Sequence, residues 1–369
     1  MKSRKYQLLS ASRIVLVTFV FSTIVMFLMR KVAIHINAID RPTSAEGNRH
    51  IHKKETPKLG GLGIFLAFLF GYILFGEQSI RMNSILIGSF IIILIGMVDD
   101  LNPVKAKYRF LVHIIAAMVI VFYGGILLDN ISAFGFSVNF GILSYPITIL
   151  FLVACTDIID LIDGLDGLSG GICSIFYLTI AIIGFYQGRY GTLVMTLTLI
   201  MLGSTLGFLV HNFHPAKIFA GDCVTFMGFI IGVITLLEFK GPALISFFVP
   251  ITILGIPILD TLFAIIRRLL KGQPPFHADK EHLHHQLLGM NFSQTVTVLI
   301  IYGINLLFAA ASICFTIIDP IIGEIIYIII FIIVIWFVLH TTIISEKNPK
   351  ITEKIKNKLT RKMKKNTVK

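Results

Sequence analysis

The strongest pattern along the chain is a series of long apolar runs separated by short polar segments. Apolar runs of this length cross the hydrocarbon core of a bilayer as helices. About eleven transmembrane helices are expected, near residues 14–33, 60–77, 83–98, 109–127, 145–160, 168–187, 191–211, 223–239, 242–266, 295–316 and 319–342. We therefore predict an all-α polytopic integral membrane protein, with a transmembrane domain over residues 1–345 and a cytoplasmic tail over residues 346–369.

The composition supports this class, because 56% of the residues are hydrophobic and only 14% are charged. Soluble domains carry nearer a quarter charged residues. The four cysteines are scattered, without the paired spacing of a zinc site or a disulfide framework. The first apolar run follows a basic start, as a signal peptide does, but no small-residue cleavage site follows it. We interpret that run as a retained helix.

The distribution of Lys and Arg residues predicts the orientation. With eleven spans, most of the 32 Lys and Arg residues fall on one side of the membrane. An excess of positive charge marks the cytoplasmic side. We therefore expect a cell-membrane protein with its N-terminus outside and its C-terminus in the cytoplasm. The basic N-terminus is the one observation that disagrees with this orientation.

The tail over residues 346–369 is strongly basic and can align Ile351, Ile355 and Leu359 along one face of a helix. Segments of this kind bind the anionic lipids of the cytoplasmic leaflet. Nucleic acid is the other common partner of a chain with a net charge of +12. Because a basic tail at the membrane surface already accounts for that charge, we expect no nucleic-acid binding.

The densest polar motif is an acidic run in which Asp157, Asp160, Asp163 and Asp166 recur every three residues. On a helix this spacing keeps the side chains near one face, and the glycines that follow indicate a loop. Four like charges repel one another and are costly to desolvate near a membrane. We expect a metal ion or Lys and Arg side chains to offset them. The alternative is an acidic helix cap or a solvated loop.

A second motif places Asp99 and Asp100 at the end of the third predicted helix, shortly before Lys105, Lys107 and Arg109. Adjacent helical positions diverge by about 100°, so the two carboxylates are not expected to share one role. One could face a metal or a proton while the other caps a helix or pairs with Lys105 or Arg109. Plain ion pairing at the membrane interface is the alternative.

Three further motifs fall on the predicted cytoplasmic side. The basic stretch from Arg49 to Gly61 could bind an anion at a helix start or could simply anchor the chain. Asp222, which follows Gly221 before a predicted helix, suits metal or phosphate binding, or a helix cap. The four histidines between His277 and His285 lack the usual helical zinc spacing but could hold phosphate oxygens.

These motifs predict both the place and the chemistry of a site. Transporters need polar groups in mid-membrane that both sides can reach. Here the polar motifs converge on one side, which favours an active site at the cytoplasmic face. Many carboxylates with basic residues and no thiolates are typical of magnesium with a phosphorylated substrate. The Gly-Lys-Ser/Thr loop of P-loop nucleotidases is absent from the sequence.

With these motifs in this order, the chain resembles the polyprenyl-phosphate N-acetylhexosamine-1-phosphate transferases, the glycosyltransferase 4 family. That family includes phospho-N-acetylmuramoyl-pentapeptide transferase and the enzymes that start teichoic acid and O-antigen synthesis. The resemblance covers about residues 35–295 and rests on the His-x-x-x-x-Pro-x-x-Gly-Gly start, Asp-Asp, Asp-Gly-x-Asp-Gly-Leu, the loop aspartate and His-x-His-His. The last motif is similar to the N-acetylglucosamine branch, especially the teichoic-acid-initiating enzymes.

The resemblance implies transfer of N-acetylhexosamine 1-phosphate, expected to be N-acetylglucosamine 1-phosphate, from a UDP-sugar to undecaprenyl phosphate with release of UMP. This would be the first membrane step of a cell-wall polymer such as teichoic acid or a polysaccharide. The alternatives are a peptidoglycan step like that of phospho-N-acetylmuramoyl-pentapeptide transferase, and a non-enzymatic transporter or scaffold of the same fold. The implied cofactor is Mg²⁺, with Mn²⁺ as a substitute, and homo-oligomerisation is left open.

The resemblance also assigns roles by motif position. Asp99, Asp100 and Asp222 would be catalytic, and Asp222 and Asp99 would hold the metal. The expected substrate-binding residues are Lys54, Lys105, Asn212, Phe219, Asp163, Asp166, His282, His284 and His285. Among these, the two aspartates would lie near the nucleotide, the phenylalanine would stack on uracil beside the asparagine, and the lysines and histidines would hold phosphates or sugar.

The chain departs from the family pattern at several positions. Asp157 and Asp160 stand where the family usually has Asn, and Lys58 stands where it usually has Arg. Cys223-Val224-Thr225 replaces the usual x-Gly-Ser after the loop aspartate. Two amides thereby become carboxylates beside a metal site, which should raise some pKa values or demand another cation.

Overall fold

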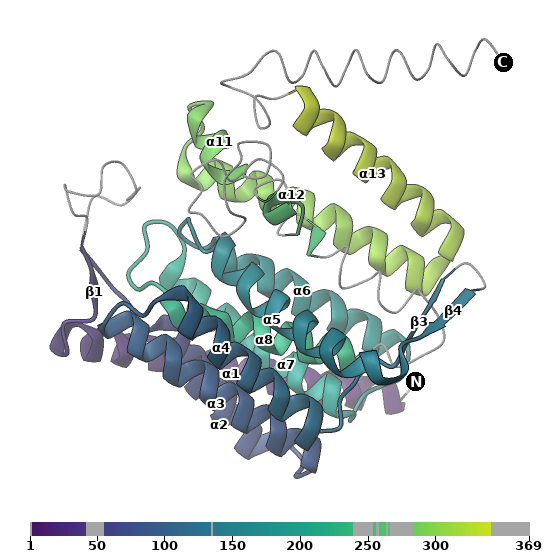
Figure 1. The fold of residues 1–369 in the computed structure, drawn as a ribbon, viewed down its shortest axis with the longest axis horizontal. Coiled ribbons are helices and arrows are strands. Elements are labelled where there is room, and N and C mark those ends of the chain that lie inside the picture. Colours follow the sequence, from purple (N-terminus) through teal and green to yellow (C-terminus); the bar gives the residue numbers. More distant parts are fainter. Residues whose placement is uncertain are drawn as a thin grey trace.

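The computed structural model describes residues 2–41, 55–133, 136–238, 254–255, 258–262, 265 and 283–340. Most of these residues are helical (Figure 1). The helices are α1 (Lys2–His35), α2 (Gly60–Phe75), α3 (Ile80–Leu101), α4 (Ala106–Met118), α5 (Ser144–Ile162), α6 (Leu168–Tyr186), α7 (Leu193–Asn212), α8 (Thr225–Glu238), α11 (Leu283–Gly289), α12 (Gln294–Ile313) and α13 (Pro320–His340). Short helical turns lie at η2 (Val119–Tyr123), η3 (Gly141–Leu143), η4 (Asp222–Val224) and η5 (Cys314–Ile318).

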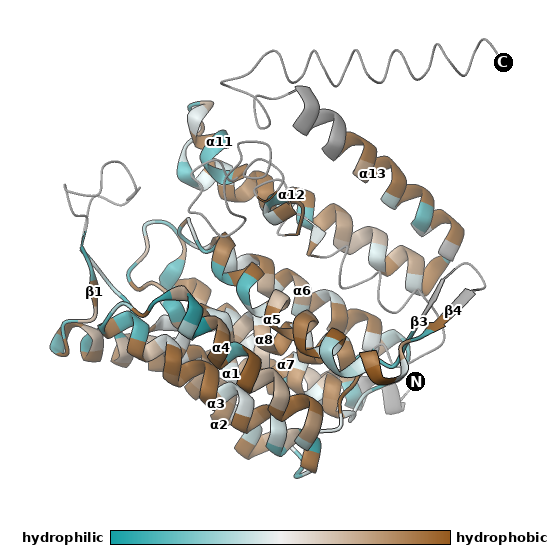
Figure 2. Ribbon diagram, viewed as in Figure 1, coloured by the Kyte–Doolittle hydropathy of each residue, from teal (hydrophilic) through white to brown (hydrophobic). Residues whose placement is uncertain are grey.

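The described helices confirm a helical, multi-pass membrane protein. Seven helical segments among the described residues are long and apolar enough to cross a bilayer: Tyr6–His35, Ile80–Leu101, Ala106–Tyr123, Gly141–Ile162, Leu168–Tyr186, Leu193–Asn212 and Gln294–Ile318. Shorter apolar helices lie at Gly60–Phe75 and Ile321–Ile333. Apolar residues run along these helices (Figure 2), and many of them, such as Leu16, Phe90 and Leu150, are exposed. Such exposure suits contact with lipid.

The predicted helix positions agree with the structure where the two can be compared. The first helix is longer than expected, because α1 begins at Lys2 rather than near residue 14. Most of the predicted span over residues 242–266 and the whole basic tail over residues 346–369 lie outside the described residues. The count of eleven spans and the role of the tail therefore stay predictions.

Helices α6, α7 and α8 form the centre of the molecule, where most of their side chains are buried. Tyr177 of α6 is fully buried and its hydroxyl donates to the carbonyl of Met227 in α8 at 3.0 Å. Helix α1 packs closely on α7, where the Ser22 hydroxyl donates to the carbonyl of Ser204 at 2.7 Å. Small residues at such crossings let helix backbones approach closely, as in other membrane bundles.

The expectation of an all-α fold misses two small antiparallel sheets. Strand β1 (Ile39–Asp40) pairs with β2 (Thr56–Pro57), and β3 (Asn130–Ala133) pairs with β4 (Phe136–Asn139). In Figure 1 the two sheets lie at opposite ends of the bundle. The pair β1–β2 follows α1 and leads into α2, so it belongs to the end where the polar motifs meet.

The helices α1 to α8 run alternately between these two ends. At one end Asp222, which opens η4, contacts Asp100 at the end of α3. At the other end Arg189, between α6 and α7, forms an ion pair of 2.7 Å with Glu238 at the end of α8. The ends of α1, α3, α5 and α7 and the starts of α2, α4, α6 and α8 thus share one end. This arrangement gathers motifs that are far apart in the sequence.

Candidate active site

The start of α2 and the loop before η4 form one continuous backbone unit. The amides of Gly60 and Gly61 donate to the carbonyls of Phe219 and Ala220, each at 2.8 Å, and the amide of Phe219 donates to the carbonyl of Pro57 at 2.8 Å. A side chain at Gly61 would overlap the backbone of Cys223, which lies 2.5 Å from the ideal Cβ position. Glycine is therefore required for this close approach. The contact fixes the position of Asp222, which begins η4.

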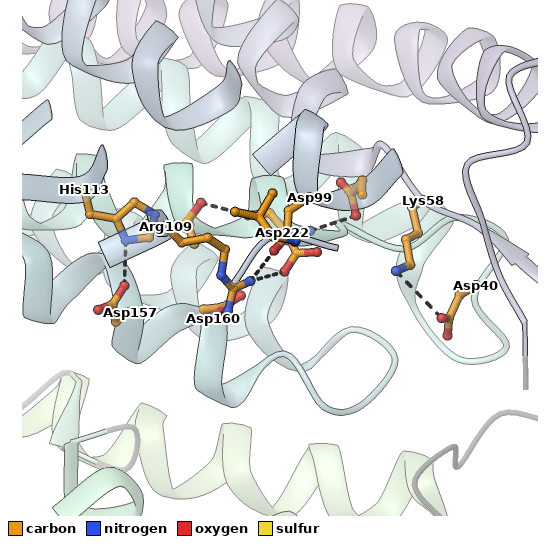
Figure 3. Close-up of polar contacts among 11 residues, drawn as sticks. Asp40, Lys58, Asp99, Arg109, His113, Asp157, Asp160 and Asp222 are labelled. Carbon is orange, nitrogen blue, oxygen red and sulfur yellow. Dashed lines mark hydrogen bonds and ion pairs between the residues drawn. The ribbon is translucent and has the colours of Figure 1, made fainter. Parts of the chain in front are cut away.

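The centre of the site is Arg109, whose guanidinium contacts three carboxylates from three elements (Figure 3). Its Nη1 lies 2.6 Å from Asp99 Oδ2 and 2.6 Å from Asp222 Oδ1. Its Nη2 lies 3.7 Å from Asp160 Oδ2. The arginine thus supplies the positive charge that the crowded carboxylates require.

Asp99 and Asp100 have different partners, as expected for neighbours on a helix. Asp99 accepts the amide of Val104 at 2.5 Å in addition to its contact with Arg109. Asp100 Oδ1 accepts the amide of Asp222 at 3.0 Å. Its Oδ2 is buried and accepts no hydrogen bond among the described residues. Asp100 therefore holds the backbone of η4, while Asp99 shares the Arg109 guanidinium with Asp222.

Gly221 allows this contact between Asp100 and η4. Its φ of +68° lies in the left-handed region, which side chains disfavour. A Cβ at this position would also collide with the Asp100 carboxylate. Gly221 is therefore needed to bring the Asp100 carboxylate at the end of α3 against the start of η4, where Asp222 lies.

The four aspartates of the acidic run do not form one cage, because each has its own partner. Asp157 Oδ1 lies 2.7 Å from Nδ1 of His113, and Asp160 faces Arg109. The two remaining aspartates lie beyond α5, which ends at Ile162. Asp163 accepts the Ser169 hydroxyl at 2.5 Å, and Asp166 Oδ2 lies 2.7 Å from Nδ1 of His214 and accepts the Ala216 amide at 3.1 Å.

The turn between α5 and α6 is held from two sides at Gly167. Its amide donates to the Asn212 side-chain oxygen at 2.9 Å, and its carbonyl accepts the hydroxyl of Tyr302 from α12. The Asn212 amide nitrogen donates to the carbonyl of Ile218 at 2.9 Å. His284 is buried and packs against Gly164 in the same turn. Elements from both halves of the chain therefore fix this turn.

The remaining predicted residues are distributed around this centre. Phe219 is half-buried in the loop before η4, and His285 is half-buried beside His284, with 4.3 Å between the ring centres. Lys105 is exposed at the position before α4. Lys54 and His282 lie outside the described residues.

Sequence reasoning missed three side chains of this region. Arg109 was expected only as one of two partners for an aspartate, whereas it joins three carboxylates. His113 follows it by one helical turn and faces Asp157. His214 pairs with Asp166. Arg109 and His113 are four residues apart, and Asp157 and Asp160 are three apart, so each pair lies about one helical turn apart on one face of its helix. This shared spacing is the one signal that could have predicted that the two helices pair.

The local electrostatics disfavour ionised carboxylates. Burial raises the pKa of Asp163 to about 6; the negative charges of Asp222 and Asp166 add to this, and the hydrogen bond from Ser169 opposes it. Burial and the charge of Asp99 raise the pKa of Asp222, while Arg109 and Lys58 oppose the rise. Both aspartates thus lie in surroundings where an additional cation would be stabilised.

The donor set fits a magnesium ion only in part. Among the described residues no group of three or more His, Cys, Asp or Glu side chains is arranged to hold a metal. Mg²⁺, however, commonly takes only one or two protein carboxylates and fills its remaining positions with water and substrate phosphates. Asp99 and Asp222, whose oxygens already share one cationic nitrogen, meet that requirement. The buried Oδ2 of Asp100 is one more oxygen beside them.

The sequence is similar to known membrane transferases. The profile of glycosyl transferase family 4 matches residues 82–238, from near the start of α3 to the end of α8, and this range includes all the described aspartates of the centre. The chain is 39% identical over 291 residues to a probable undecaprenyl-phosphate N-acetylglucosaminyl 1-phosphate transferase of Bacillus subtilis, covering 78% of this chain and 79% of the relative.

Two further relatives carry related descriptions. A decaprenyl-phosphate N-acetylglucosaminephosphotransferase of Mycolicibacterium smegmatis is 31% identical, with 78% of each chain covered. An undecaprenyl-phosphate alpha-N-acetylglucosaminyl 1-phosphate transferase of Salmonella typhimurium is 28% identical, with 78% of this chain and 79% of the relative covered. The three alignments cover similar shares of each chain.

Proposed function

Because this chain belongs to glycosyl transferase family 4, we propose that it transfers N-acetylglucosamine 1-phosphate from UDP-N-acetylglucosamine to undecaprenyl phosphate. The similarity to the Bacillus subtilis relative over 79% of that protein carries this proposal. The transfer of N-acetylglucosamine 1-phosphate to a polyprenyl phosphate is common to the relatives described above. The UDP donor follows from the family, and we propose teichoic acid or a polysaccharide as the polymer begun.

The reaction is a phosphoryl transfer at the β-phosphorus of the UDP-sugar. An oxygen of the lipid phosphate forms a bond to this phosphorus, and the bond from the same phosphorus to the oxygen that bridges to the α-phosphate breaks. UMP leaves with the bridging oxygen, and the lipid carries a diphosphate linked to the sugar. Such reactions depend mainly on positioning and on neutralisation of charge.

Asp99, Asp100 and Asp222 are the proposed catalytic residues. Asp222 and Asp99 would hold Mg²⁺, or Mn²⁺ in its place, which supplies Lewis-acid stabilisation of the phosphate oxygens. Asp99 lies near the end of α3, at the site. Its proposed second role is to orient or deprotonate the lipid phosphate. Asp100 acts through the amide of Asp222, to which it is bound at 3.0 Å, and so fixes the metal-binding carboxylate.

The nucleotide is proposed to lie beside the loop before η4 and the turn between α5 and α6. Phe219 would stack on uracil, with Asn212 and the Asp163–Asp166 turn around it. Asn212 and Asp166 already contact Ile218 and Ala216 of the loop, so their contribution includes shaping the pocket. Lys54, Lys105, His282, His284 and His285 are proposed to hold phosphates or the sugar.

We propose that the site faces the cytoplasm, where UDP-sugars are available. Since α1 ends and α2 begins at the site, this places the N-terminus outside. Both α8 and α12 start from the site end, which supports the predicted additional crossing near residues 242–266 and the total of eleven. The C-terminal tail would then lie on the cytoplasmic leaflet and bind its anionic lipids. Assembly as a homo-oligomer is compatible with this arrangement.

A substrate panel tests the proposed function. Purified protein is incubated with undecaprenyl phosphate, Mg²⁺ and one of several UDP-N-acetylhexosamines, and UMP release is measured. We expect UMP with UDP-N-acetylglucosamine, its loss after addition of a chelator, and its loss in Asp222→Ala. Absence of UMP with every donor would reject the proposal. Uptake of a substrate into sealed vesicles would favour a transporter instead.

A further inference from the structure

The contacts of Arg109 resemble those of a metal ion more than those of a simple ion pair. A single nitrogen, Nη1, lies 2.6 Å from oxygens of both Asp99 and Asp222. These carboxylates come from α3 and η4, and a third, Asp160, comes from α5 (Figure 3). The guanidinium thus joins three elements through their carboxylates, as a bound divalent cation does.

The charge around Arg109 is only partly compensated. The three carboxylates in contact with it, when ionised, carry two more negative charges than the guanidinium balances. Two positive charges are what one divalent cation supplies. The neighbouring Lys58 forms its ion pair with Asp40, at 3.8 Å. Its charge also acts on Asp222 from a distance, but it forms no ion pair with the three carboxylates among the described residues. The site therefore attracts a divalent cation even with the arginine in place.

Arg109 nevertheless occupies the position that such a cation needs. Mg²⁺ binds carboxylate oxygens at about 2.0–2.1 Å. An ion that bound Asp99 Oδ2 and Asp222 Oδ1 from the side on which Arg109 lies would overlap Nη1, which is 2.6 Å from each oxygen. The other oxygen of Asp99 already accepts the Val104 amide at 2.5 Å, so the carboxylate has little freedom to turn away. On that side the arginine and the metal compete for the same two oxygens.

We infer that Arg109 is an exchangeable counter-ion for the metal, a positioning residue that holds the site together until the metal binds. Without metal, the guanidinium keeps the ends of α3 and α5 and the start of η4 in place. When the metal binds, Nη1 leaves Asp99 and Asp222. Asp160, 3.7 Å from Nη2, keeps the released guanidinium beside the cluster. This inference rests on the proposed metal site at Asp99 and Asp222.

Metal binding by the full-length protein, measured without substrates, tests this inference. Free Mn²⁺ is followed by electron paramagnetic resonance in the wild type, Arg109→Gln and Lys107→Gln. The last variant is the matched control, because Lys107 is an exposed cation on the same helix that contacts the ring of Tyr108. We expect Arg109→Gln to bind Mn²⁺ at least about tenfold more tightly, and Lys107→Gln to bind it like the wild type.

Thermal unfolding provides the second readout. Metal-free Arg109→Gln should unfold at a lower temperature than the wild type, and Mn²⁺ should stabilise it by a larger shift. Equal or weaker Mn²⁺ binding by Arg109→Gln would overturn the inference. If that variant does not fold, Arg109→Lys replaces it, since one ammonium cannot reproduce the fork of the guanidinium. Tighter binding is again expected, and unchanged binding would again overturn the inference.

The same titration separates this inference from the proposed metal site. Asp222→Asn should bind Mn²⁺ much more weakly than the wild type; binding that is unchanged would place the metal elsewhere and reject the ligand assignment. Absence of Mn²⁺ binding in all variants would reject the exchange. Transferase activity is measured separately by UMP release, so rejection of the exchange between Arg109 and the metal would not by itself reject the proposed transferase reaction.

Discussion

At the scale of residues, the central feature is that closely spaced aspartates are kept apart by separate partners. Asp157 faces His113 and Asp160 faces Arg109, one helical turn apart on the same two helices. Asp163 takes a serine hydroxyl. Separate partners reduce the repulsion that four neighbouring carboxylates would otherwise suffer. Substitutions in the acidic run should therefore have different effects, according to the partner that each one loses.

Asp160→Asn should preserve the transferase reaction. The Asp160 oxygen is 3.7 Å from Nη2 and its side chain is a quarter exposed, so the contact supplies charge rather than a hydrogen bond. Such pairs contribute about 0.2–1 kcal/mol, and UMP release should stay within about fivefold of the wild type. Complete loss of activity in a folded Asp160→Asn variant would show that this carboxylate takes part in the chemistry.

His113→Ala should lower stability, because it leaves Asp157 without its histidine inside the membrane region. Loss of one partner of a buried polar pair costs about 1–3 kcal/mol. Asp157 is 39% exposed, which favours the lower end of this range. The readout is the apparent unfolding temperature in detergent. His113→Gln, which retains a donor, is the matched control and should lose less; equal losses in the two variants would argue against the pair.

The residue types of the site could be predicted from the sequence, but their pairing could not. The carboxylates, the loop aspartate and the need for a cation follow from spacing and charge. Which side chain supplies the positive charge, here Arg109, depends on which helices are neighbours, and α4 faces α5 only in the folded bundle. For the same reason the pairing of His214 with Asp166 was not predicted.

At the scale of elements, the start of α2 and the loop before η4 act as one unit. Three backbone hydrogen bonds join segments that are more than one hundred residues apart in the sequence. Gly61 and Gly96 both approach Cys223 so closely that a Cβ would meet its backbone. The position of Asp222 therefore depends on glycines in α2 and α3, neither of which takes part in the chemistry.

Gly61→Ala should reduce activity strongly without changing any polar group. The added methyl would lie 2.5 Å from the Cys223 backbone, so η4 must shift. Overpacking of this kind costs about 1–3 kcal/mol, and a displacement of about 1 Å at a catalytic group can cost about a hundredfold in rate. UMP release and the unfolding temperature are the measurements.

Gly303→Ala is the matched control for that substitution. It lies in α12, where nothing is within 4 Å of the ideal Cβ position. We expect unchanged activity and equal or higher stability, because alanine favours a helix by about 1 kcal/mol over glycine. If both glycine variants had the same activity, the packing at Gly61 would not control the site.

The long helices were predictable because apolar runs of membrane-spanning length have few other solutions. Predicted spans such as 145–160 and 168–187 match α5 and α6 within a few residues. The short strands were not predicted, since two to four residues carry too little pattern. The contact of Tyr302 with Gly167 was also beyond sequence reasoning, because it joins helices that are far apart in the chain.

At the scale of the whole molecule, alternating helices bring all the described polar motifs to one end. Asn102 is exposed at this end, after α3, and Gln187 is exposed at the opposite end, after α6. If the site faces the cytoplasm, these two positions lie on different sides of the membrane. The positive-inside pattern predicts this orientation but leaves it untested.

Cysteine labelling of intact cells tests the orientation. Asn102→Cys and Gln187→Cys are compared in a Cys314→Ser background, because the other native cysteines are buried. A membrane-impermeant thiol reagent should label position 187 in intact cells and position 102 only after lysis. The opposite pattern would place the site outside and contradict the proposed use of a cytoplasmic UDP-sugar.

Transfer of a sugar phosphate differs from transfer of a sugar in the fate of the donor's β-phosphorus, which can be followed with a label. Purified protein is given undecaprenyl phosphate, Mg²⁺ and UDP-N-acetylglucosamine labelled with ³²P at the β-phosphorus. We predict that the label enters the lipid product together with the sugar while unlabelled UMP is released, and that Asp222→Asn forms no labelled lipid. Sugar-bearing lipid without label, together with labelled UDP in solution, would show transfer of the sugar alone and would reject the proposed phosphoryl transfer.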